Sequence, residues 1–338
     1  MSDNQRVFGS TADGREVVEC AIRGGNITAS ILTWGAVVRD VRLGGDQGRP
    51  VTLGLNSIGD YEAHSPYLGA IVGRSANRIN KGQMTFQGKA LQLAQNRDGH
   101  HAHGGFEGFS RRIWTIAEHD ENRLKLELFS PDGDEGYPGN VTATCEYSLS
   151  EDGVFSIRLG AVTDAPTLIN MANHCYFNLD QADTVLDHEF EVASEAYTVL
   201  GDGLIPTGEI RSIADSEFDF RSKRPIRFER DGKHIHYNLN FVIDTARRDT
   251  VKRVGCLTGP ATDTEMEIWS TEPGLQFFDG INLALPVLGL DGRLYQSFAA
   301  VALEPQCFPD APNHDDFPDT TLLPDQEYLQ ITEYRFKW

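Results

Sequence analysis

The feature that most constrains the fold is a strict alternation of apolar and polar residues that recurs along the chain. In 141–149, Val, Ala, Cys, Tyr and Leu occupy every second position, with Thr, Glu and Ser between them. The segments 124–128, 155–159 and 334–338 alternate in the same way. Because successive side chains of a strand point to opposite faces of a sheet, each run predicts a half-buried β-strand.

Short turn sequences separate these runs. They are Gly44-Gly45-Asp46, Pro131-Asp132-Gly133, Glu151-Asp152-Gly153 and Leu290-Asp291-Gly292. No segment has a sustained 3.6-residue apolar stripe, so the pattern predicts an all-β chain folded as a large antiparallel β-sandwich. The length of 338 residues is compatible with roughly two domains. No linker or repeat interrupts the strand pattern, so we predict a single domain over 1–338.

The chain is strongly acidic, with 30 Lys and Arg against 50 Asp and Glu and a formal net charge of −20. Nucleic-acid binding requires clustered cations that neutralise phosphates, and the sequence has no basic stripe. An anionic membrane surface is disfavoured for the same reason. We therefore expect neither partner, whereas a neutral small molecule is compatible with this charge.

The cysteines indicate a reducing compartment. Five are scattered along the chain, without a Cys-x-x-Cys pair, which is typical of free thiols rather than of a disulfide framework. The first residues lack the apolar stretch of a signal peptide, and no run of ~18 apolar residues is present. The sequence thus predicts a cytoplasmic protein.

Several common catalytic motifs are absent. The sequence contains no phosphate-binding Gly-x-x-x-x-Gly-Lys-Ser/Thr loop and no Gly-x-Ser-x-Gly nucleophile elbow. A dinucleotide-binding glycine fingerprint after a strand is also missing. ATP-driven, serine-hydrolase and nicotinamide chemistry therefore have no support from motifs.

His174 is the first candidate for catalysis. It lies in the apolar run 169–179, where Asn173, Tyr176 and Asn178 place polar atoms around it. Such a histidine is either a hydrogen-bonded core residue or a catalytic imidazole.

Two further pairs of histidines have spacings that suit a metal. His101 with His103, and His234 with His236, can each present two ligands from one strand face. A catalytic metal usually needs a third protein ligand, and none lies at a diagnostic spacing. We therefore predict loop histidines and no metal.

Charged and aromatic residues supply the other candidates. Glu304 follows the small apolar run 297–303, so we expect it at the end of a buried strand, where a raised pKa lets a carboxylate act as a base. Arg74 and Arg78 are either hydroxyl-binding donors or surface residues in structural ion pairs. The aromatic residues that could pack on a sugar face, or simply fill the core, are Trp34, Trp114, Tyr176, Phe177, Phe277 and Phe278.

A set of motifs occurs in order along most of the chain. They are Gly73-Arg74-Ser75-Ala76-Asn77-Arg78-Ile79, His103-Gly104-Gly105 with Gly108-Phe109 and Trp114, Ser130-Pro131-Asp132-Gly133 with Glu135-Gly136-Tyr137-Pro138-Gly139-Asn140, Asn173-His174-Cys175-Tyr176-Phe177-Asn178-Leu179, Ile205-Pro206-Thr207-Gly208-Glu209, Glu272-Pro273-Gly274-Leu275-Gln276-Phe277, Leu303-Glu304-Pro305-Gln306, Pro309-Asp310-Ala311-Pro312-Asn313 and Phe317-Pro318. Together, these collinear motifs resemble the aldose 1-epimerase (galactose mutarotase) family.

The resemblance implies a β-sandwich of the galactose-mutarotase type with a sugar in an open cleft. It also implies interconversion of the α and β anomers of an aldohexose such as D-glucose or D-galactose, without a cofactor. Glu304 would be the general base toward the C1 hydroxyl, and His174 the general acid toward the ring oxygen. The implied sugar-binding residues are His103, near the ring oxygen, and Asn77, Arg78 and Gln276, on the hydroxyls.

The chemistry suits this assignment. Opening a hemiacetal needs one proton removed and one delivered, and a positioned acid and base supply ~10²–10⁴-fold. We expect the carboxylate and the imidazole on opposite sides of the sugar ring. One residue departs from the family, which commonly has Asp-His-Asn-Phe where this chain has Asn238-Leu239-Asn240-Phe241. An amide both donates and accepts, so Asn238 predicts an altered sugar preference.

Three alternatives remain open. A glycoside-cleaving enzyme would need a second carboxylate, for which Asp310 is the candidate, although a structural turn residue is the favoured interpretation. A sugar-binding protein would use the same scaffold without catalysis. A metal-dependent enzyme would use His101, His103 and His236. The sequence leaves a monomer and a homodimer equally open.

Overall fold

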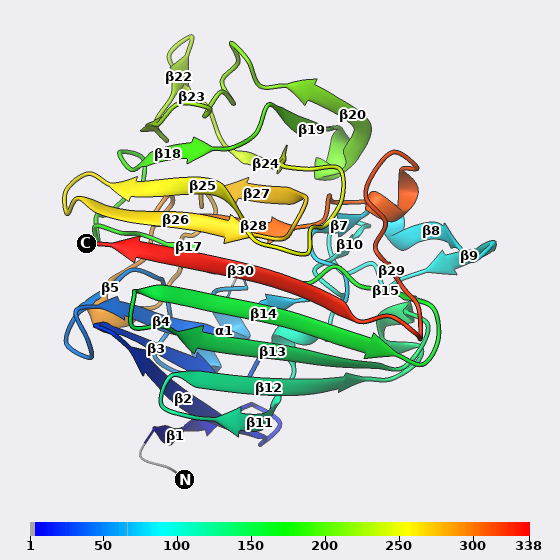
Figure 1. Ribbon diagram of the computed structural model, residues 1–338, viewed down its shortest axis with the longest axis horizontal. Coiled ribbons are helices and arrows are strands. Elements are labelled where there is room, and N and C mark those ends of the chain that lie inside the picture. The colour runs from blue at the N-terminus through cyan, green and yellow to red at the C-terminus, as the bar shows by residue number, and fades with distance from the viewer. Residues whose placement is uncertain (1–3, 66) are drawn as a thin grey trace.

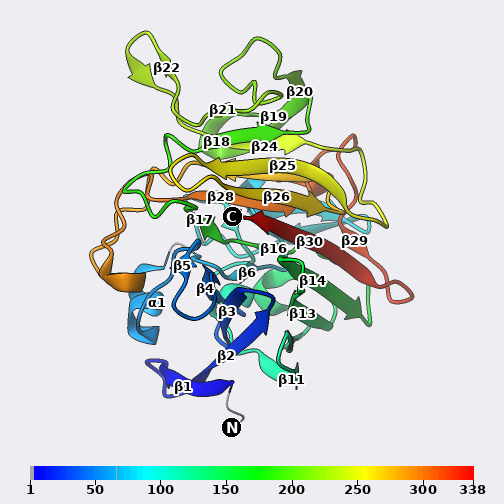
Figure 2. The same cartoon turned by 60° about the vertical axis from the view of Figure 1, so that its left-hand side comes forward.

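The computed structural model describes residues 4–65 and 67–338, which form layers of antiparallel strands (Figures 1 and 2). Figure 1 looks onto a nine-stranded sheet, and a six-stranded and a five-stranded sheet pack on its far side. This arrangement confirms the predicted all-β antiparallel sandwich.

The nine-stranded sheet has the order β11-β12-β13-β14-β30-β26-β25-β18-β21. Its strands are β11 (Thr115–His119), β12 (Arg123–Ser130), β13 (Val141–Leu149), β14 (Val154–Thr163), β18 (Glu189–Val192), β21 (Arg224–Pro225), β25 (Lys252–Gly259), β26 (Thr264–Ser270) and β30 (Tyr328–Lys337). The alternating runs of the sequence lie in β12, β13, β14 and β30. In β13 every apolar position is buried and the positions between are more exposed, as the alternation predicts.

The other two large sheets form the second layer. The six-stranded sheet has the order β17-β28-β27-β24-β19-β20, with strands β17 (Tyr176–Phe177), β19 (Ala196–Leu200), β20 (Pro206–Ser212), β24 (Asn238–Val242), β27 (Gly274–Phe278) and β28 (Val301–Gln306). The five-stranded sheet runs in chain order through β1 (Gln5–Ser10), β2 (Glu16–Gly24), β3 (Ile27–Leu32), β4 (Val38–Leu43) and β5 (Arg49–Pro50).

Short strand pairs and single helical turns connect the sheets. The pairs are β6 (Ile71–Val72) with β16 (Ala172–Asn173), β7 (Arg78–Ile79) with β10 (His101–Ala102), β8 (Gln83–Phe86) with β9 (Lys89–Gln92), β15 (Thr167–Leu168) with β29 (Thr321–Leu322), and β22 (Glu229–Arg230) with β23 (Lys233–His234). The 3₁₀ turns are η1 (Asn80–Gly82), η2 (Phe109–Arg111), η3 (Asp134–Gly136), η4 (Asp202–Leu204), η5 (Leu290–Gly292) and η6 (Ala311–Asn313).

The α-helix α1 (Ile58–His64) is short. Ser57 caps its N-terminus, where the Ser57 hydroxyl accepts a hydrogen bond from the Asp60 amide at 3.1 Å. Among the described residues, no helix has the length and apolarity needed to cross a membrane.

The main core lies between the layers. The Tyr334 ring of β30 packs on Phe177 of β17 with centroids 4.8 Å apart. Phe190 of β18 stacks on Phe277 of β27 at 4.9 Å. Tyr147 of β13 donates a hydrogen bond to a carbonyl in the turn between β3 and β4. One apolar cluster therefore takes side chains from all three large sheets.

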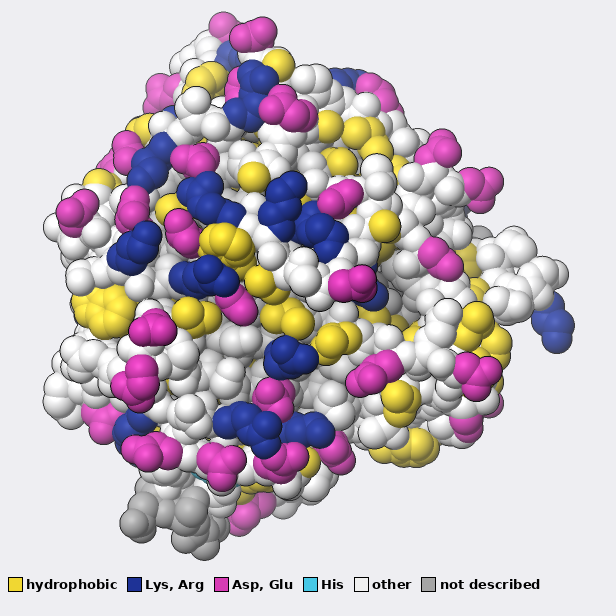
Figure 3. Space-filling model, in the orientation of Figure 1, with side chains coloured by type: hydrophobic (Ala, Val, Ile, Leu, Met, Phe, Trp, Pro, Cys, Tyr) yellow, Lys and Arg dark blue, Asp and Glu magenta, His cyan; other side chains and the backbone are white. Residues whose placement is uncertain are grey.

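The outer face of the nine-stranded sheet carries charges of both signs. Figure 3 shows Lys and Arg side chains lying among Asp and Glu side chains on this face. Arg253 pairs with Glu191 at 2.8 Å, and Arg335 pairs with Glu333 at 2.6 Å. The charges on this face are therefore interleaved rather than gathered into a basic stripe.

Candidate active site

The candidate site lies on the face of the six-stranded sheet that points away from the main core. Leu275 and Phe277 of β27 and Leu303 of β28 point into the main core. Because side chains alternate along a strand, Gln276 and Glu304 between them point the other way. Gln276 and Glu304 are also register partners across the β27–β28 pair.

These polar side chains line a cavity of about 260 Å³. All seven residues predicted for the site lie in its wall, namely Asn77, Arg78, His103, His174, Asn238, Gln276 and Glu304. They come from segments as far apart in sequence as β7 and β28, so only the fold brings them together.

The Glu304 carboxylate and the His174 imidazole are adjacent in this cavity. Glu304 Oε1 lies 3.6 Å from His174 Nε2, and the side chains are 2% and 7% exposed. The prediction that the two groups lie on opposite sides of a sugar ring is therefore wrong. The prediction that Glu304 ends its strand is also wrong, because Glu304 lies inside β28. Every residue of β28 is buried, so both faces of this strand are covered.

Burial acts on the two groups in opposite directions. It raises the pKa of Glu304 to about 8, and the Arg78 guanidinium opposes this shift. It lowers the pKa of His174 to about 4, and the positive charge of Arg97 lowers it further. Desolvation disfavours the charged form of each group, which explains both directions.

Aromatic and imidazole rings surround His174. The Tyr67 and Tyr176 rings lie 5.9 and 5.0 Å from the His174 ring. His103 packs edge-on at 5.4 Å, and its Nδ1 accepts a hydrogen bond from the Asn77 amide at 3.3 Å. This hydrogen bond leaves the proton of the neutral His103 ring on Nε2. Burial, followed by the nearby His174, holds the pKa of His103 well below its usual value.

Asn238 and Gln276 form a hydrogen-bonded pair in the same wall. Gln276 Nε2 donates to Asn238 Oδ1 at 2.7 Å. With its oxygen used in this way, Asn238 presents its amide hydrogens as donors. An aspartate at this position would present only acceptors.

Comparisons with known proteins agree with this geometry. A family model described as aldose 1-epimerase matches residues 20–335. A galactose mutarotase from Rattus norvegicus is 33% identical over 342 residues, which cover 99% of each chain. An aldose 1-epimerase from Escherichia coli K12 is 34% identical over 321 residues, 92% of each chain. The chain belongs to the aldose 1-epimerase family.

A solved structure places the fold in the same family. An aldose epimerase homologue from C. elegans is 28% identical and superposes with a TM-score of 0.87, covering 94% of this chain and 98% of the other. The sandwich of this aldose 1-epimerase family member is therefore of the galactose-mutarotase type.

Arg74 lies outside the pocket of this epimerase family member. It is 1% exposed, and its guanidinium donates to the Ser130 and Pro131 carbonyls at 2.8 and 2.9 Å. The interpretation of Arg74 as a surface ion pair is therefore wrong, and its role is to hold neighbouring loops. Arg78, four residues later, lines the pocket.

Asp310 is a structural turn residue. Its Oδ1 accepts hydrogen bonds from the Asn80 amide at 2.9 Å and from Asn313 Nδ2 at 2.7 Å. Its φ of +56° places it in the left-handed region at the start of η6. Asp310 does not belong to the residues that line the pocket, so a carboxylate pair with Glu304 is not formed.

The proposed metal set of His101, His103 and His236 is not assembled in the described part of the chain. His101 Nδ1 lies 2.7 Å from the Ala94 carbonyl, and its Nε2 lies 2.6 Å from the Tyr137 hydroxyl. Both ring nitrogens of His101 are therefore already used in structural hydrogen bonds.

The aromatic candidates divide between core and pocket. Tyr176 and Phe278 line the cavity, whereas Trp34, Trp114, Phe177 and Phe277 belong to core clusters. Sequence reasoning missed Tyr67 and Arg97, which also line the pocket. Both lie in loops without a motif, so no local pattern could have identified them.

A larger hollow of about 520 Å³ lies over the five-stranded sheet. Its charged side chains are paired with one another, as in Arg39 with Glu19 at 3.1 Å and Arg42 with Asp291 at 2.8 Å. This hollow lacks the adjacent acid–base pair of the smaller cavity, so the smaller cavity is the better candidate for an active site.

Proposed function

We propose that the protein is an aldose 1-epimerase, an isomerase that interconverts the α and β anomers of an aldohexose such as D-glucose or D-galactose. The observation that supports this proposal is the adjacent pair of Glu304 and His174, 3.6 Å apart and buried in a cavity with hydrogen-bonding walls.

The reaction needs two proton transfers at one end of the sugar. Glu304 takes the proton of the C1 hydroxyl while His174 delivers a proton to the ring oxygen, and the bond between C1 and the ring oxygen breaks. Rotation about C1–C2 then presents the other face of the carbonyl, and the reverse transfers close the ring. Both reacting oxygens are bonded to C1, so adjacent groups can reach both of them.

The proton count of the pair suits this chemistry. With pKa values of about 8 for Glu304 and about 4 for His174, the pair holds one proton near neutral pH. The neutral pair and the ion pair of carboxylate with imidazolium contain the same number of protons. Movement of that proton from Glu304 to His174 produces the base and the acid that the reaction uses.

The remaining pocket residues orient the sugar. We propose that the sugar hydroxyls are held by the polar side chains Asn77, Arg78, His103, Asn238 and Gln276. Tyr176 and Phe278 offer aromatic faces for the C–H surfaces of the ring. The reaction that we propose uses no cofactor, because each step is a proton transfer or a bond rotation.

Polarimetry of freshly dissolved α-D-glucose and α-D-galactose tests the proposal. We expect the wild type to accelerate mutarotation and Glu304→Gln to lose about 10²–10⁴-fold of that acceleration. Asp310→Asn is the matched control, since it changes a buried carboxylate outside the cavity. Equal rates for wild type and Glu304→Gln would contradict the base assignment.

Two further assays, of glycoside hydrolysis and of sugar binding, separate the alternatives. Release of free sugar from aryl glycosides would support glycoside cleavage. Binding of aldoses without any acceleration would support a sugar-binding protein. The oligomeric state can be measured in parallel by sedimentation.

We also propose a cytoplasmic location. All five cysteines are free and buried, which suits a reducing compartment.

A further inference from the structure

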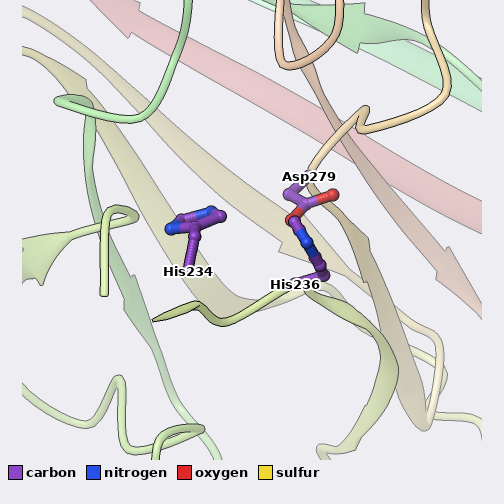
Figure 4. Close-up of side chains that lie close together, drawn as sticks. All are labelled: His234, His236 and Asp279. Carbon is purple, nitrogen blue, oxygen red and sulfur yellow. The ribbon is translucent and has the colours of Figure 1, made fainter. Parts of the chain in front are cut away.

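A second cluster of ligand-type side chains lies outside the sugar pocket. His234 ends β23, His236 lies just before β24, and Asp279 follows β27 (Figure 4). One potential ligand atom from each residue lies within 4.8 Å of the other two. Two imidazoles and one carboxylate are a common ligand set for a first-row divalent cation.

Asp279 is a buried carboxylate without a strong cationic partner. Its side chain is 0% exposed, and the nearest cationic candidate is His236 Nδ1, 3.7 Å from Oδ2. The carboxylate accepts hydrogen bonds from the Tyr237 amide at 2.9 Å and the Ile281 amide at 3.2 Å. Within the described residues, no Lys or Arg pairs with it. A buried carboxylate of this kind is costly unless a positive charge is supplied.

His234 also has an unsatisfied group. Its Nε2 is a buried atom without a hydrogen-bond partner among the described residues. A buried ring nitrogen normally has a partner, and a metal ion is one such partner. A cation bound here would give the unpaired nitrogen of His234 a partner and would neutralise the buried carboxylate of Asp279.

Phe298 fixes the orientation of the two imidazoles. The His236 ring stacks on Phe298 with centroids 5.6 Å apart and an interplanar angle of 11°. The His234 ring meets the same phenyl ring edge-on at 5.3 Å and 87°. Packing of this kind limits ring rotation, which lowers the entropic cost of binding an ion.

The cluster is accessible from solvent. The His236 side chain is 49% exposed, so an ion can enter and water can complete its coordination. We propose that His234, His236 and Asp279 bind one divalent cation of the zinc class. Mg²⁺ and Ca²⁺ are poor candidates because both prefer oxygen ligands.

The ion would stabilise one wall of the sugar pocket. Asn238 and Phe278, which line the pocket, are register partners across the β24–β27 pair. Asp279 is adjacent to Phe278 in the chain, and His236 is two residues before Asn238. A bound ion would therefore link the strand ends that carry these two pocket residues, and the thermal midpoint of unfolding should rise with Zn²⁺.

Calorimetric titration of the full chain with ZnCl₂, after chelator treatment and dialysis, tests the proposal. We expect one Zn²⁺ per chain and at least about 10-fold weaker binding by His236→Gln and by His234→Gln. His64→Gln is the matched control, because it removes an imidazole elsewhere on the molecule. Since His236 is half exposed, His236→Gln should unfold at the wild-type temperature in the absence of metal.

Co²⁺ provides a second measurement. The wild type should give visible absorption bands of protein-bound Co²⁺ that are lost in His236→Gln and Asp279→Asn. Absence of binding by the wild type would overturn the proposal. Undiminished binding by His236→Gln would also overturn it, and would assign the ion to other histidines. Because no sugar is present, the result is independent of the proposed epimerase activity.

Discussion

Glu304 and His174 illustrate how burial sets the protonation of single residues. Each side chain is nearly inaccessible to water, and desolvation moves the pKa of the carboxyl to about 8 and that of the imidazole to about 4. Between these values the pair holds one proton, which is the proton count that an acid and a base acting together require.

The pH profile of catalysis follows from this proton count. Below about pH 4 both groups are protonated and the base is lost, and above about pH 8 neither is protonated and the acid is lost. We expect kcat/KM to be constant between these limits and to fall on both sides. Polarimetry across this range, with each buffer blank subtracted, measures the profile. A single limb near pH 6.5 would instead indicate an exposed histidine.

Asn238 is the residue expected to alter sugar preference. Its oxygen accepts from Gln276 at 2.7 Å, so its amide is left to donate to a sugar hydroxyl. Asn238→Asp replaces this donor with an acceptor, and we expect the ratio of KM values for D-glucose and D-galactose to change by about 10-fold. Asn282→Asp, which adds the same charge at an exposed position of the pocket rim, is the control. Unchanged ratios for Asn238→Asp would refute the specificity role.

At the scale of elements, the strands with one buried face are the ones that sequence patterns describe well. β13 alternates as predicted, whereas all six residues of β28 are buried. A strand buried on both faces has no alternation that marks its ends, which explains why Glu304 was expected at a strand end. The loop between β12 and β13 is held instead by side chains such as Arg74.

Arg74 is expected to stabilise this loop. It donates to the carbonyls of Ser130, Pro131 and Pro138 at 2.8–2.9 Å. Arg74→Met removes the donor to all three carbonyls and leaves the acceptor of the buried Ser130 unpaired, at a cost of about 1–3 kcal/mol. We therefore expect the free energy of unfolding in urea to fall by about 1–3 kcal/mol.

Arg211→Met is the matched control for this experiment. Arg211 pairs with Glu209 on the surface and its side chain is 54% exposed, so its loss should cost less than about 1 kcal/mol. Equal losses for the two variants would show that the Arg74 contacts do not stabilise this loop.

At the scale of the whole molecule, the shared core is the main feature. The apolar cluster contains side chains from the nine-, six- and five-stranded sheets, so none of these sheets buries its inner face alone. This supports our proposal that residues 1–338 form one domain.

A single domain should unfold in one transition. We expect far-UV circular dichroism and tryptophan fluorescence to give coincident urea curves, because Trp114 lies in the shared core and Trp34 in a neighbouring cluster. Two separated transitions would indicate that part of the sandwich folds independently.

The sequence by itself determined the fold class and predicted residues that line one cavity. Alternation is local, so half-buried strands such as β13 could be located without a structure. Collinear motifs contain six of the seven predicted pocket residues, including His174, Glu304 and Gln276. Asn238 could likewise be recognised from a single departure in a motif.

Only the tertiary structure decided how these residues meet. The 3.6 Å contact of His174 with Glu304 joins segments more than a hundred residues apart. The walls formed by Tyr67 and Arg97, and the grouping of His236 with Asp279, depend in the same way on how distant segments pack. Local periodicity specifies which side chains share a face of a strand, but the register and packing of distant strands specify which faces come together.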